Sequence, residues 1–182
     1  YHAGLIARQL IEGWARIPVE VEAASEFRYR NPIITPSTLV VAVSQSGETA
    51  DTLTAIRDAR IKGAKVFGIT NVIGSPVARE SDGVIYTKAN KEIAVASTKS
   101  FLGQIVSLTL LAMVLAQAKG KLSIAQIRLL FKELADTAEQ VEEVLSDTKA
   151  IDIAAQACKD ANDALFIGRG MGAAICYEGA LK

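Results

Sequence analysis

A hydrophobic strand that leads directly into a hydroxyl-rich loop and then a helix constrains the fold of this chain more than any other feature. The strand is predicted over Leu39–Val43 and the helix over Glu48–Lys62, which ends before Gly63. Two more strands follow, at Lys65–Thr70 and Val84–Thr87. Strands that alternate with helices at this spacing predict right-handed βαβ units. We therefore expect an α/β fold of three layers, a flavodoxin-like parallel sheet flanked by helices.

The loop after the first strand has the composition of an anion site. Ser44, Ser46 and Thr49 supply hydroxyl groups, and Gly47 permits close approach of the backbone or a positive φ. A helix that starts at this point adds free N–H groups and the positive end of its dipole, which together suit a phosphate. In parallel sheets, ligands bind beyond the carboxyl ends of the strands, where this loop lies. The alternative is that Ser46 only caps the helix, with Thr49 as a second polar group.

The loop lacks the signatures of nucleotide sites. No Gly-Lys-Ser/Thr follows it, and the three-glycine spacing of dinucleotide-binding folds is missing. We therefore expect a small phosphorylated metabolite as the ligand.

Composition excludes several classes of partner. The 20 basic and 20 acidic residues balance and form no basic stripe, so neither nucleic acid nor a membrane surface is expected as a partner.

His2 is the one histidine and is expected to be an ordinary helix residue, so we expect no metal or other cofactor. Cys158 and Cys176 are expected to be free thiols in a cytoplasmic protein. The apolar run Phe101–Ala116 is short for a bilayer and contains polar residues, which predicts a buried helix.

Two long helices are predicted after the sheet, at Ser97–Gln117 and Ser123–Ser146. The second carries apolar residues at alternating three- and four-residue spacing. Such a stripe is typical of a helix that packs on its own fold and, as the alternative, of a coiled-coil dimer seam. Because the two helices leave much apolar surface, we expect a homodimer.

The end of the chain resembles its beginning. A predicted strand, Ala164–Ile167, leads through Gly168-Arg169-Gly170 into a helix over Ala173–Lys182, which aligns loosely with the helix at the start. We expect residues 1–150 to form one subdomain with its trailing helices and residues 151–182 to begin a second, truncated copy. The chain starts without Met and stops inside a helical pattern, which predicts a piece of a longer protein.

Elsewhere the sequence predicts a short strand at Pro18–Val21 and a turn-rich connection at Arg28–Ser37.

Four segments, in order along the chain, resemble the sugar isomerase (SIS) family. They are Ser44–Thr52, Gly68–Asn71, Glu92–Lys99, and Gly168–Gly170 taken with Glu178–Lys182. The third and fourth point to the branch of the family in which a glutaminase domain precedes the isomerase. This resemblance implies a part of an enzyme that uses fructose 6-phosphate and glutamine in amino-sugar synthesis. A non-catalytic sugar-phosphate sensor and another sugar-phosphate isomerase or deglycase are the alternatives.

The resemblance also implies roles for individual residues. The hydroxyls of the loop named above, Ser44, Ser46 and Thr49, would hold the sugar 6-phosphate together with the Gln45 backbone. Val95 and Ser97 would contact the sugar, and Lys182 would be the catalytic group beside its reactive carbons.

Other parts of the site are expected outside this chain. Ketose-to-aldose isomerisation moves a proton between C1 and C2 and needs a positioned carboxylate base. The resemblance places that base, the ring-opening groups and the glutaminase beyond these residues, and it gives Glu178 a non-catalytic position. We therefore expect no turnover by this chain alone.

Overall fold

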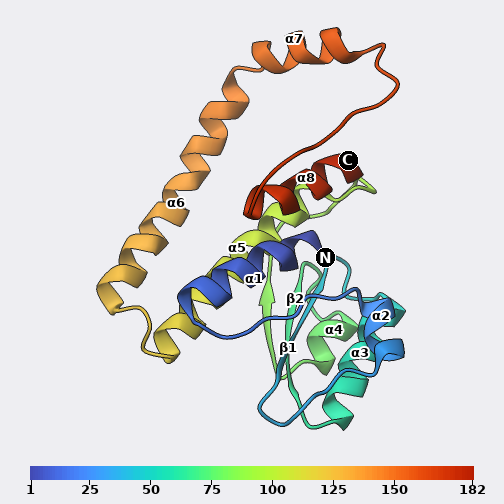
Figure 1. Ribbon diagram of the computed structural model, residues 1–182, viewed down its shortest axis with the longest axis vertical. Helices are drawn as coiled ribbons and strands as arrows, with labels where there is room; N and C mark the ends of the chain where they lie inside the picture. The colour runs from blue at the N-terminus through green and yellow to red at the C-terminus, as the bar shows by residue number, and fades with distance from the viewer.

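The computed structural model describes residues 1–182 and contains one parallel sheet of three strands in the order β1-β2-β3 (Figure 1). The strands are β1 (Leu39–Ser44), β2 (Lys65–Thr70) and β3 (Gly83–Tyr86). The crossovers contain α3 (Ala50–Ile61) and the short α4 (Pro76–Glu80). The predicted parallel α/β sheet is confirmed.

Helices cover both faces of the sheet. Helices α1 (His2–Trp14) and α5 (Thr98–Ala118) lie on one face, where Ile69 of β2 packs into a core with residues of both helices. Helix α3 lies on the other face with α2 (Ala24–Arg30) and α4, over a core that includes Val66 of β2. Because Val66 and Ile69 have opposite parity along the strand, they point to opposite faces. This is the predicted three-layer arrangement.

Helix α5 is long and apolar enough to cross a membrane by length and composition alone. In the structure it packs along α1 and against β2, and Leu108, Ala112 and Ala116 are buried in this core. The buried hydroxyls of Ser107 and Thr109 donate to carbonyls one turn back in the same helix, so they are satisfied. The segment is packed as a core helix.

The last three helices are α6 (Ile124–Ser146), α7 (Lys149–Cys158) and α8 (Met171–Leu181). Helices α6 and α7 extend away from the sheet, and α8 returns to pack on α1 (Figure 1). No residue of α6 is fully buried, but Ile127 and Leu134 of its apolar stripe are half-buried and the helix contacts α5. The rest of the stripe is largely exposed, so it packs on this fold only in part. The division at residue 150 remains a prediction.

Three local predictions were wrong. Residues 18–21 and 164–167 form no strand, because neither segment has a neighbouring strand to complete a hydrogen-bonded ladder. Helix α2 occupies the start of the connection expected to be irregular. It ends at Arg30 and is capped by Asn31, whose φ of 49° is left-handed, and Pro32 follows. Arg30 at its C-terminal end pairs with Glu22 at 2.7 Å.

Candidate functional site

The three strands end side by side, and the candidate site begins there. Ser44, Thr70 and Tyr86 are paired in register across the sheet at the carboxyl ends of their strands. The loops that follow must therefore leave the sheet along one edge. This is the edge at which α/β sheets bind ligands.

The predicted phosphate-binding residues are Ser44 at the end of β1 and members of the loop Gln45–Thr49 that follows it. The Ser44 Oγ accepts a hydrogen bond from the Gly47 N–H at 2.9 Å, and the Ser46 Oγ accepts one from the Glu48 N–H at 3.2 Å. Each hydroxyl keeps its own proton to donate to a ligand. Thr49, not Ser46, is the N-cap of α3, and its exposed side chain makes no capping bond. Helix capping therefore does not account for these hydroxyls.

Gly47 determines how tightly this loop packs. Its φ is +68°, and a Cβ at this position would lie 2.2 Å from the Oγ of Ser75 and 2.8 Å from the Oγ1 of Thr70. Both neighbours are almost completely buried. The Gly47 carbonyl also accepts from the Val77 N–H at 3.0 Å. The loop is thus fixed from below by side chains of β2 and of the turn before α4.

Thr70 and Ser75 were not identified as site residues from the sequence. The available signal was their position: Thr70 ends the strand next to Ser44, and Ser75 lies in the following loop. Both residues shape the site indirectly, because their side chains pack beneath Gly47 and hold the loop in place.

Asn71 connects β2 to the segment that carries Val95 and Ser97. Its Oδ1 accepts from the Thr87 hydroxyl at 2.9 Å and from the Ala89 N–H at 2.8 Å, and its Nδ2 donates to the Asn90 carbonyl at 2.7 Å. Val95 is fully exposed. Ser97 is half-buried and has a left-handed φ of 55°.

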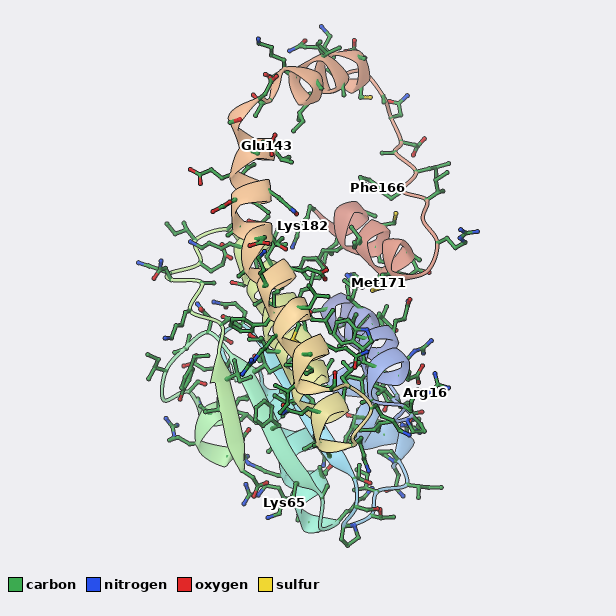
Figure 2. All side chains as sticks on the ribbon, turned by 90° about the vertical axis from the view of Figure 1, so that its left-hand side faces the viewer. Arg16, Lys65, Glu143, Phe166, Met171 and Lys182 are labelled. Carbon is green, nitrogen blue, oxygen red and sulfur yellow. The ribbon has the colours of Figure 1, made fainter.

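Lys182 lies at the end of α8 opposite Met171 (Figure 2). Its Nζ donates to the Ala96 carbonyl and lies 2.7 Å from the Oε1 of Glu178. The other oxygen of Glu178, Oε2, lies 2.7 Å from the Nδ1 of His2. His2 is therefore not the ordinary helix residue that the sequence suggested. It bridges α1 to α8.

The pKa of Glu178 is set by opposing effects. Burial would raise it, but hydrogen bonds from Lys182 and His2, with their charges, outweigh burial and hold the pKa below its ordinary value. Glu178 is therefore ionised at neutral pH, and each of its oxygens already has a partner.

A cavity of about 200 Å³ lies where the N-terminal ends of α1 and α5 meet α8. Ser97 and Lys182 both line it, so the structure brings these two predicted residues together, whereas Val95 and the Gln45–Thr49 loop do not line it. No three His, Cys, Asp or Glu side chains gather closely enough to hold a metal ion. The remaining lining residues are Tyr1, His2, Ala3, Ala96, Phe101, Gln104, Glu178 and Leu181.

Comparison with known proteins gives consistent results. A family model described as the SIS domain matches residues 1–114. Glutamine–fructose-6-phosphate aminotransferase (isomerizing) of Clostridium perfringens is 48% identical over 182 residues, which cover all of this chain and 30% of that protein. The enzyme of the same name from Symbiobacterium thermophilum is 51% identical over 181 residues, again 30% of its length. The chain thus spans about a third of the length of these curated relatives.

Solved structures agree with this relationship. The C-terminal domain of glucosamine-fructose-6-phosphate aminotransferase from Francisella tularensis superposes with a TM-score of 0.96 at 40% identity, covering 100% of this chain and 51% of that one. Glucosamine-6-phosphate deaminase from Thermotoga maritima superposes with a TM-score of 0.70 at 23% identity, covering 100% and 53%. The second likeness shows a shared fold only.

Proposed function

The chain belongs to the SIS domain family, and on that premise we propose that it is the sugar-phosphate-binding part of the isomerase domain of a glutamine–fructose-6-phosphate aminotransferase. The relatives that match its whole length carry that name. In this proposal the complete protein uses fructose 6-phosphate and glutamine to make glucosamine 6-phosphate and glutamate, in amino-sugar synthesis in the cytoplasm. Recovery of the protein with membranes after cell fractionation would contradict the cytoplasmic assignment.

The observation that carries the proposal is the loop at the end of β1. Ser44 and Ser46 use their oxygens to accept loop N–H groups and keep hydroxyl protons for a ligand. The unbonded Thr49 hydroxyl lies at the start of α3, where the helix dipole favours a negative charge. Neutral donors at a helix start bind a phosphate without help from lysine or arginine.

The second part of the proposal concerns the sugar. Val95 and Ser97 would contact it, and Lys182 would act beside its reactive carbons. The contacts of Lys182 with Ala96 and Glu178 support this role, because they hold the ammonium group at the wall of the cavity that Ser97 also lines. A fixed position for a charged group is what catalysis near a reacting centre requires.

Glu178 does not fit the role of the isomerase base. A general base must reach the proton that it removes, whereas both oxygens of Glu178 are engaged by Lys182 and His2. Its lowered pKa also makes it a weaker base than an ordinary glutamate. We therefore assign it a structural part in the site and propose that the base comes from residues beyond this chain.

Removing one loop hydroxyl should weaken binding of fructose 6-phosphate. We expect about a tenfold loss for each of Ser44→Ala, Ser46→Ala and Thr49→Ala, because a hydrogen bond to a charged group contributes about 1.5 kcal/mol or more and tenfold corresponds to about 1.4 kcal/mol. Titration calorimetry at millimolar sugar phosphate measures this. Ser123→Ala is the matched control, because Ser123 caps α6 and should leave binding unchanged. Parent-like affinity in all three loop variants would contradict the proposal.

We propose that the protein is a homodimer. The supporting feature is the apolar stripe of α6, where Ile124, Phe131 and Leu145 are each more than half exposed. A single chain leaves this apolar surface in water, which favours association. Sedimentation velocity should find a dimer, and monomer alone at high micromolar concentration would contradict this.

A further inference from the structure

Three side chains from two ends of the sequence form one connected chain of contacts. His2 Nδ1 lies 2.7 Å from the Glu178 Oε2, and Lys182 Nζ lies 2.7 Å from the Glu178 Oε1. All three side chains are largely buried, with exposed fractions of 19% for His2, 13% for Glu178 and 23% for Lys182. Lys182 alone among them also reaches the backbone of the Glu92–Lys99 segment, at the Ala96 carbonyl.

These contacts fix which nitrogen of the histidine carries a proton. An ionised carboxylate can only accept hydrogen bonds. The His2 Nδ1 must therefore donate to Glu178, so the neutral imidazole has its proton on Nδ1 and its Nε2 is unprotonated. No other side-chain hydrogen bond of the ring occurs that could oppose this arrangement.

The surroundings hold the ring in one orientation. Tyr177 of α8 stacks on it with centroids 5.8 Å apart and planes at 28°, and Tyr1 meets it edge-on at 5.6 Å. The titratable groups that face Glu178 are His2, Lys182 and the Tyr1 amino group. From α5 and the segment before it, the cavity is lined by the uncharged Ala96, Ser97, Phe101 and Gln104. Among the side chains of this chain that line the cavity, Glu178 is thus the one carboxylate.

We propose that His2 is a positioning residue: its Nδ1–H anchors one oxygen of Glu178 so that the other oxygen holds the Lys182 ammonium group at the wall of the cavity. Without His2, Oε2 is left without a partner in a largely buried place. The carboxylate then turns toward water, and Lys182 loses its fixed position. The inference rests on the proposed function only in placing Lys182 beside a sugar.

The test uses a matched pair of substitutions. In His2→Asn, the side-chain amide nitrogen occupies nearly the place of Nδ1 and keeps the donor, whereas His2→Leu has similar bulk and no donor. The readout is the rate at which Lys182 is acylated, followed by peptide mass spectrometry without any sugar present. Lys149, which is exposed on α7, reports the reactivity of the reagent within the same sample.

We expect Lys182 to be acylated about tenfold faster in His2→Leu and at the parent rate in His2→Asn, since one hydrogen bond to a charged group corresponds to about tenfold. Equal rates in parent and His2→Leu, or a rise in both variants, would overturn the proposal. Because no sugar is needed, this result is separate from the calorimetric test of phosphate binding.

A second measurement needs no substitution. His2 is the only histidine, so the imidazole-nitrogen NMR signals of the chain belong to it alone. In the spectrum of the singly protonated ring, we expect the proton to be on Nδ1. Protonation at Nε2 would overturn the proposal, and this measurement decides alone if His2→Leu fails to fold.

Discussion

Replacing Gly47 with alanine should lower the free energy of unfolding by about 3 kcal/mol. A left-handed φ of +68° costs an L-residue roughly 1–2 kcal/mol. Overpacking adds roughly 1–3 kcal/mol, because the new methyl would lie 2.2 Å from Ser75 Oγ and 2.6 Å from its Cβ. Ser75 is only 2% exposed.

Gly74→Ala provides the matched control. Gly74 has nearly the same φ, +70°, but no atom lies within 4 Å of a Cβ built there. It should therefore show only the backbone penalty, roughly 1–2 kcal/mol. Urea unfolding followed by circular dichroism compares the two variants. Equal losses would mean that the close packing beneath the loop does not contribute, contrary to the structure.

Replacing Asn71 with alanine should have the second largest effect, a loss of about 2 kcal/mol. The substitution removes three hydrogen bonds that tie Thr87, Ala89 and Asn90 to the end of β2. A net contribution of about 0.5–1.5 kcal/mol each gives this magnitude. Hydrogen exchange should quicken in residues 88–97, the segment that carries Val95 and Ser97.

Asn71→Asp separates the two sides of this amide. The aspartate keeps an oxygen for Thr87 and Ala89 but loses the donor to the Asn90 carbonyl. We expect a loss of about 1 kcal/mol, between parent and Asn71→Ala. A loss as large as that of alanine would show that losing the donor, together with repulsion between the new carboxylate oxygen and the Asn90 carbonyl, outweighs the two accepted bonds.

The fold and the position of the hydroxyl-rich loop could be predicted from the sequence because both depend on local patterns. The strand that ends at Ser44 is hydrophobic and followed at once by hydroxyls and a helix, so its neighbours in sequence define it. In the parallel sheet, Ser44 pairs in register with Thr70. The resemblance to the SIS family likewise rests on short contiguous motifs.

Contacts between distant residues could not be predicted in this way. Glu178 and His2 are separated by almost the whole chain, and only the packing of α8 on α1 brings them together. A lone histidine at a helix start has no local feature that distinguishes a positioning role. Conversely, residues 164–167 have the local pattern of a strand, but a strand also needs a partner, which these residues lack in this structure.

Backbone amide NMR during a titration with fructose 6-phosphate tests the central claim most directly. If the loop binds the phosphate, the largest chemical-shift changes should occur at the N–H groups of Gln45–Thr49, because the hydroxyl donors and the start of α3 meet there. Fructose, which has no phosphate, should leave those signals in place. Shifts confined to other residues, or equal shifts with fructose, would contradict the account.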